Sequence, residues 1–284
     1  MDMAESRTLD VELSAGGQRL LTPALRQRME SLAFGTATIA LVLLIWELLP
    51  RILPLQAGTR LFLAVPSRIF AMLWQMFATG TIWAPLGVSA TAFAIGLALA
   101  IVVGLPLGIL LGRSATLNAM LDPFVTAFNA TPRLVFLPLL MLWLGIGLAS
   151  KVAIVFSGAL FPLLINTHEG VRNADKLLIN VVRSFGASGW DVSRLVIIPN
   201  ALPFIVVGVR LAIGRAILGV VVAEFFGAQD GLGVVMVRAA SSFKVDVVFA
   251  GLIVFAALSL VMTGLVKIVE NRMSRWRPQR AENE

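Results

Sequence analysis

Two segments of this 284-residue chain, 85–112 and 247–266, are long enough to cross a lipid bilayer and contain no charged residue. A membrane-spanning helix needs about 20 apolar residues, whereas apolar stretches of about 10–14 residues are typical of soluble cores. Only 14% of the residues are charged, against about a quarter in soluble domains, and the mean hydropathy is +0.90. The sequence therefore predicts an all-α integral membrane protein.

Four further segments bring the expected number of transmembrane helices to six. Prolines interrupt the third and fourth of these spans, and arginines lie inside the third and fifth. The expected spans are 31–50, 85–112, 124–145, 152–167, 200–223 and 247–266. We expect a surface amphipathic helix near 66–74 and a turn with a short helix within 225–246. The expected organisation is an N-terminal tail (1–30), one membrane domain (31–270) and a C-terminal tail (271–284).

The positive charges predict the orientation of the chain in the membrane. Of the 23 Lys and Arg residues, 14 fall on the side of both termini, 6 on the other side and 3 within spans. Lys and Arg are enriched on the cytoplasmic side of membrane proteins. Both termini and the polar loop 168–199 are therefore predicted to be cytoplasmic.

The loop 168–199, between the fourth and fifth spans, is much longer than a simple connection between helices requires. Residues 173–175 can cap a helix with apolar residues at helical spacing. Gly186 and Gly189 then interrupt this helix, and a second short helix is expected from Trp190. Two interpretations remain open. Phe185 and Trp190 are apolar anchors for a docking partner, or the loop is an amphipathic turn on the lipid headgroups.

Several kinds of chemistry are excluded by the residues that are missing. The chain has no cysteine and one histidine, His168, which excludes thiol chemistry and argues against a metal site or an integral-membrane enzyme. It also has no Gly-Lys dipeptide and hence no phosphate-binding Walker A loop. An ion-coupled secondary carrier stays open as one interpretation, although no internal repeat of the kind common in such carriers is visible.

The loop resembles the signature loop of permease subunits of bacterial ABC importers. That signature reads Glu-Ala-Ala, three residues, Gly, nine residues, Ile, one residue and Leu-Pro. Gly186 and Pro199 occupy its glycine and proline, with Val196 and Ile198 at the aliphatic positions. The chain departs at the opening triplet, residues 180–182, which contains no glutamate.

Other short motifs, from residue 65 onward, extend the resemblance over most of the chain. They resemble those of one branch of the family, which takes up nitrate, sulfonates, taurine and similar small anions. Each motif alone is unspecific, and their order along the chain carries the argument. They are Val65-Pro66-Ser67, Gly104-Leu105-Pro106-Leu107-Gly108, Leu121-Asp122-Pro123, Leu142-Trp143-Leu144-Gly145-Ile146-Gly147, Ser184-Phe185-Gly186-Ala187-Ser188, Gly208-Val209-Arg210 and Gly231-Leu232-Gly233.

The resemblance implies a type I ABC importer permease fold with a cytoplasmic coupling helix between the fourth and fifth spans, in a bacterial inner membrane. The leading hypothesis is therefore a transporter permease without catalysis of its own, and the ion-coupled carrier is the alternative. The resemblance further implies two separate ATPase subunits, which bind ATP and Mg²⁺, and a periplasmic or lipid-anchored binding protein. A second permease is also implied, which is either a copy of this chain or a different chain. No cofactor is expected on this chain, and no nucleic acid. The residues expected to couple to the ATPase are Arg183, Ser184, Phe185, Gly186, Ala187, Ser188, Gly189, Trp190 and Asp191.

The candidate translocation pathway contains Asn129, Thr131, Arg133 and Arg210. Pro132 frees backbone carbonyls beside the first three residues, and an arginine within a span costs about 2.5–3.5 kcal/mol at the membrane centre on insertion scales. Arg133 therefore lines the pathway and attracts an anion, or extends its side chain to water at the membrane face. Arg210 recurs in the resemblance, and a partner on another span or on another subunit is expected for Arg210 or Arg215.

Overall fold

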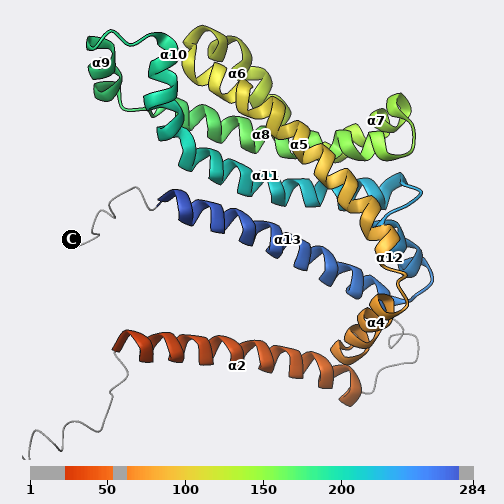
Figure 1. The fold of residues 1–284 in the computed structure, drawn as a ribbon. Coiled ribbons are helices and arrows are strands. Elements are labelled where there is room, and N and C mark those ends of the chain that lie inside the picture. Colours follow the sequence, from red (N-terminus) through yellow and green to blue (C-terminus); the bar gives the residue numbers. More distant parts are fainter. Residues whose placement is uncertain (1–22, 54–62, 275–284) are drawn as a thin grey trace, which may run out of the picture. The chain divides into compact units, whose positions relative to one another are not determined.

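The computed structural model describes residues 23–53 and 63–274, and regular structure in these residues is exclusively helical (Figure 1). The helical elements are α2 (Pro23–Ile52), α4 (Pro66–Ala78), α5 (Trp83–Arg113), α6 (Ala115–Ala130), η2 (Arg133–Phe136), α7 (Leu137–Leu144), α8 (Leu148–Arg172), α9 (Lys176–Ser184), α10 (Gly189–Val192), η3 (Ser193–Ile197), α11 (Ile198–Gly227), α12 (Leu232–Ser241) and α13 (Val245–Ser274). The chain divides into two compact units, Met1–Ser67 and Arg68–Glu284.

The described part of the first unit is the long apolar helix α2 and the chain leading into α4. Near the C-terminal end of α2, Glu47 accepts hydrogen bonds from the Ser67 backbone N–H (2.9 Å) and hydroxyl (2.8 Å). Trp46 donates its indole N–H to the Ala64 carbonyl at 3.0 Å. These bonds satisfy polar groups at the end of an otherwise lipid-compatible helix.

The core of the second unit is α8, which packs along both α5 and α11. Small residues allow this close packing, as is typical of helix pairs in membranes. A Cβ added at Gly108 of α5 would lie 2.6 Å from Thr167 Cβ, and one added at Gly158 of α8 would lie 3.1 Å from the Arg215 carbonyl. The motif 104–108 thus contains a close-packing site at Gly108.

Five helices among the described residues are long and apolar enough to span a membrane, and six if the bent pair α6–α7 forms one broken span. This agrees with the six expected spans. The third span, however, does not begin at residue 124. Helix α6 begins at Ala115, where the Ser114 hydroxyl accepts a hydrogen bond from the Leu117 N–H at 3.2 Å. Asp122 and Pro123, which precede the expected span, lie inside this helix.

The span breaks where the sequence places Pro132. Thr131 is extended, as the residue before a proline usually is, and the axis turns by 87° between α6 and the segment that leads into α7. Helix α8 is also longer than the expected 152–167. It runs from Leu148 to Arg172, so the polar loop begins later than residue 168. The expected helices near 66–74 and within 225–246 are confirmed as α4 and α12.

Candidate coupling loop and translocation pathway

The loop between α8 and α11 folds as two short helices around a glycine. Asp175 caps α9, its carboxylate accepting a hydrogen bond from the Leu177 N–H at 2.8 Å. Gly186 has φ +80°, a left-handed conformation that favours glycine. Ser188 and Asp191 then cap α10 reciprocally: the Ser188 N–H donates to Asp191 at 2.9 Å and the Asp191 N–H donates to the Ser188 hydroxyl at 3.3 Å.

The second helix, expected to be short, is not a separate element. It continues from α10 through the π-helical segment η3 directly into α11. A movement of α10 would therefore be transmitted along the backbone to the long helix α11. At the opposite end of the second unit lie α7 and α12, so the loop and these helices mark two ends of the same bundle (Figure 1).

One side of the α9–α10 pair is anchored to the bundle. Val192 of α10 and Ala174 before α9 are buried in a small core with Val171, Ile197 and Ala201. Half-buried hydrophobic residues packed against this core come from α5, α11 and the loop itself. They are Ile109, Ile179, Val182, Ala187 and Ile205.

The other side of the pair is apolar and exposed. The side chains concerned are Leu177 (70% exposed), Leu178 (50%), Val181 (45%), Phe185 (87%) and Trp190 (67%). All of the expected coupling residues except Ala187, which is half-buried, are exposed. A capped, anchored pair of helices that exposes aromatic side chains has the chemistry of a protein-docking surface.

A cavity of about 300 Å³ lies where α6 ends against α8 and α11. Two of the expected pathway residues, Asn129 and Thr131, line it. Arg215 of α11, which the sequence shows as one of three arginines within spans, lines the same cavity. The remaining lining residues are Ala130, Pro132, Leu134, Ile154, Gly158, Leu218, Gly219 and Val222.

The other two expected pathway residues are placed differently. Arg210 is ion-paired with Glu270 of α13 and does not line this cavity. The expected partner on another span is thus Glu270. Arg133 begins η2, directly after Pro132, and its side chain lies outside the described part of the structure. That Asn129, Thr131, Arg133 and Arg210 belong to the translocation pathway stays a prediction.

The comparison with protein families decides the identity of the chain. Residues 104–275 match the family model described as "Binding-protein-dependent transport system inner membrane component". The match covers the cavity, both helices of the loop, α11 and α12. This chain belongs to that family.

Two relatives match most of the length of the chain. It is 32% identical over 254 residues to the taurine transport system permease protein TauC of Escherichia coli (strain K12), covering 88% of this chain and 90% of the relative. It is 33% identical over 243 residues to the putative aliphatic sulfonates transport permease protein SsuC of Bacillus subtilis (strain 168), covering 86% and 87%. The expected ABC importer permease is confirmed, and the ion-coupled carrier is not favoured.

The fold has a solved counterpart. An inward-facing structure of the MetNI methionine ABC transporter contains a chain that superposes with a TM-score of 0.60, covering 72% of this chain and 98% of that one at 19% sequence identity. At this identity the likeness concerns the fold alone. It confirms the type I ABC importer permease architecture expected from the sequence.

The permease also contains a buried polar network that the sequence analysis missed. Glu224 of α11 is 2% exposed and accepts hydrogen bonds from the Ser89 hydroxyl (2.8 and 2.9 Å) and the Gly233 N–H (2.8 Å). Lys151 of α8 lies 3.5 Å from the same carboxylate and donates to the Asp230 carbonyl. The Leu232 N–H donates to Ser89 at 2.9 Å. The network joins α5, α8, α11 and the loop before α12.

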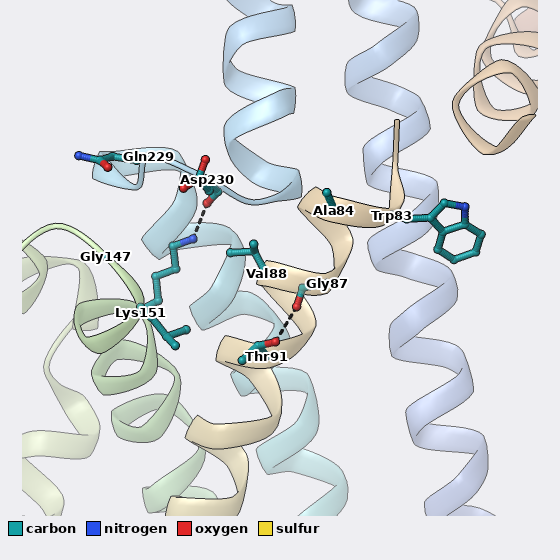
Figure 2. A pocket seen from close by; sticks show the side chains of 10 residues that line it. Trp83, Ala84, Gly87, Val88, Thr91, Gly147, Lys151, Gln229 and Asp230 are labelled. Carbon is teal, nitrogen blue, oxygen red and sulfur yellow. Dashed lines mark hydrogen bonds between the residues drawn. The ribbon is translucent and has the colours of Figure 1, made fainter. Parts of the chain in front are cut away.

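Beside this network lies a cavity of about 450 Å³, between the first turns of α5 and α8 and the loop that follows α11 (Figure 2). Lys151, Asp230, Gln229 and Thr91 contribute polar groups to its wall. The Lys151 ammonium points to the Asp230 carbonyl in Figure 2. Two of its three N–H groups therefore have acceptors within the protein, the Asp230 carbonyl and the Glu224 carboxylate. Lys151 was expected in a loop. Its partner Glu224 lies far away in sequence, so no local pattern indicates their contact.

Proposed function

We propose that this chain is the membrane-spanning permease of an ATP-driven importer for a small sulfonate-type anion. The observation that carries the proposal is the exposed apolar surface of α9 and α10, whose other side is packed against the bundle. The chain belongs to the binding-protein-dependent permease family and resembles taurine and sulfonate permeases. The permease supplies the pathway and performs no catalysis. ATP and Mg²⁺ bind to the separate ATPase subunits.

Coupling runs through the loop in this proposal. The exposed residues from Arg183 to Asp191 seat in the ATPase, and the core around Val192 holds the two helices together as they move. Since α10 is continuous with α11, closure of the two ATPases would shift α11, which lines the pathway. The missing glutamate at 180–182 removes one possible ion pair, whereas the apolar anchors remain.

The assembly proposed is two permeases, two ATPases and a binding protein that delivers the solute on the outer side. A second copy of this chain is the simplest permease partner. The charge bias of the tails and loops supports cytoplasmic termini and a cytoplasmic position for α9 and α10 in the bacterial inner membrane.

Reconstitution tests this function. The complex, purified from its source through a tag on this chain, is inserted into proteoliposomes with its binding protein, and uptake of labelled taurine and ethanesulfonate is measured. We expect uptake that requires ATP and stops when the ATPase is inactivated. Uptake driven by an ion gradient without ATP would contradict the proposal and favour a secondary carrier.

A further inference from the structure

We infer that the cavity formed by Asn129, Thr131 and Arg215 is an anion-contacting site within the translocation pathway, with Arg215 supplying its charge. The inference rests on the proposed function and deepens it, because it assigns a solute contact to the permease itself. It also replaces Arg210 by Arg215 as the arginine of α11 that meets the solute.

The depth of Arg215 is the first argument. It lies 17 residues after the start of α11 and 12 residues before its end. At 1.5 Å per residue it is about 18 Å from the nearer end of the helix, which is too far for the side chain to reach bulk water. A guanidinium at this depth needs a water-filled cavity, an anion or a partner subunit. Asn129, about 21 Å along α6 from its start, lies at a comparable depth.

The second argument is the contrast between the two arginines of α11. Arg210 is neutralised by Glu270. Among the described residues, Arg215 makes neither an ion pair nor a side-chain hydrogen bond. The buried carboxylate of Glu224, on the same helix, is already bonded to Ser89 and Gly233 and lies beside Lys151. A counter-charge for Arg215 must therefore come from outside the described chain, and a passing anion supplies one.

The third argument is the chemistry of the cavity wall. The Asn129 amide makes no hydrogen bond to other described residues, so its N–H groups are available to an anion. The Thr131 hydroxyl donates to the Ala127 carbonyl at 2.8 Å. Leu134, Leu218 and Val222 make much of the rest of the wall apolar. Such a wall suits a small amphipathic ion, with the sulfonate oxygens at Arg215 and Asn129 and a short alkyl chain on the apolar side.

The site is suited to passage of the solute and not to its storage. One arginine and one amide offer few hydrogen bonds to an anion, and conduction requires contacts weak enough to release the solute. Specificity would remain with the binding protein. Arg215 would instead exclude cations and lower the cost of moving a sulfonate through the middle of the membrane.

The absence of cysteine from the chain allows a direct test of charge in the cavity. In the intact complex, Asn129→Cys is reacted with two methanethiosulfonates, one bearing a sulfonate and one a trimethylammonium group. The ratio of their rates is compared with that at Thr79→Cys, at the end of α4 and outside the cavity. We expect the ratio at position 129 to favour the anionic reagent by about tenfold relative to position 79, because a nearby fixed charge acts oppositely on the two reagents.

Adding Arg215→Gln should abolish this preference, whereas Arg215→Lys should retain it. Equal ratios at positions 129 and 79, or no reaction at position 129 with and without ATP, would overturn the inference. A preference that survives Arg215→Gln would assign the charge to another residue and overturn it as well. The first comparison keeps Arg215 intact, so it remains informative even if the glutamine variant fails to assemble.

Transport gives a second readout that separates this inference from the proposed function. In proteoliposomes, Arg215→Gln should lower the number of ethanesulfonate ions imported per ATP hydrolysed by about tenfold, while the loaded binding protein still stimulates hydrolysis. Arg272→Gln, on an exposed arginine of α13, is the matched control. Unchanged import by Arg215→Gln would overturn the solute contact. Absence of ATP-driven uptake in the wild type, with the reagent preference intact, would instead contradict only the proposed function.

Discussion

At the scale of single residues, the Gly231-Leu232-Gly233 motif is explained by Glu224. Gly231 has φ +123°, and a Cβ built there would lie 2.0 Å from a Glu224 carboxylate oxygen. A Cβ at Gly233 would lie 2.8 Å from Glu224 Cβ. The motif therefore lets the backbone before α12 fold closely around a buried carboxylate.

Replacing Gly231 by alanine should destabilise the permease by several kcal/mol, because it adds a clash with Glu224 to about 1–3 kcal/mol of backbone strain. The thermal midpoint of the protein in detergent, followed by size-exclusion chromatography, measures the effect. Gly264→Ala on α13 is the control, since nothing lies within 4 Å of a Cβ at that position. Equal midpoints for the two variants would contradict this account of the motif.

The Lys151–Glu224 pair gives a second prediction at this scale. Lys151→Met should cost about 3–5 kcal/mol, because it leaves a buried carboxylate without its positive neighbour. Adding Glu224→Gln removes that charge, and the double variant should recover a large part of the loss. The four thermal midpoints of the double-mutant cycle measure the coupling. Additive losses would mean that the two charges do not stabilise each other.

At the scale of elements, the α9–α10 pair shows what local patterns can predict. The cap at Asp175, the break at Gly186 and the renewed helix at Trp190 were all expected, since capping residues and glycines act over a few residues. The ends of α6 and α8 were not. The expected spans began at 124 and ended at 167. Helix α6 begins earlier, at Ala115, where Ser114 caps it, although none of its residues is buried. Helix α8 continues to Arg172, because Gly170 and Val171 of its last turns are packed in the protein interior.

Truncating the exposed aromatic residue at the tip of the loop should weaken binding of the ATPase. Phe185→Ala removes a side chain that is 87% exposed and makes no core contact, so the permease itself should keep its stability. If Phe185 is an anchor of the interface, the ATPase affinity should fall at least tenfold, which corresponds to about 1.4 kcal/mol. Affinity is measured by titrating the ATPase onto the permease in nanodiscs.

Leu260→Ala is the control for this loss of apolar surface, because Leu260 of α13 is 74% exposed and lies far from the loop in the sequence. Its ATPase affinity should equal that of the wild type. An equal loss in both variants would indicate a general effect of apolar truncation. Unchanged affinity in Phe185→Ala would instead favour the interpretation in which the loop lies on the lipid headgroups.

At the scale of the whole molecule, the number of spans, the long loop and the family resemblance could be predicted from the sequence. Long charge-free segments are local and have few alternative interpretations. The contacts among Ser89, Lys151 and Glu224 could not be predicted from the sequence, because these residues lie on three different helices. The shared cavity of Arg215 and Asn129 could not be predicted either, because the packing of α6, α8 and α11 forms it. The fold brings these groups together, and their spacing along the chain gives no sign of these contacts.

The measurement that tests the central claim most directly is native mass spectrometry of the gently solubilised complex, captured through a tag on this chain. We expect two permeases with two copies of a Walker-A-containing ATPase, and loss of the ATPase when Phe185 and Trp190 are both replaced by alanine. Recovery of this chain alone, still competent for uptake, would contradict the account.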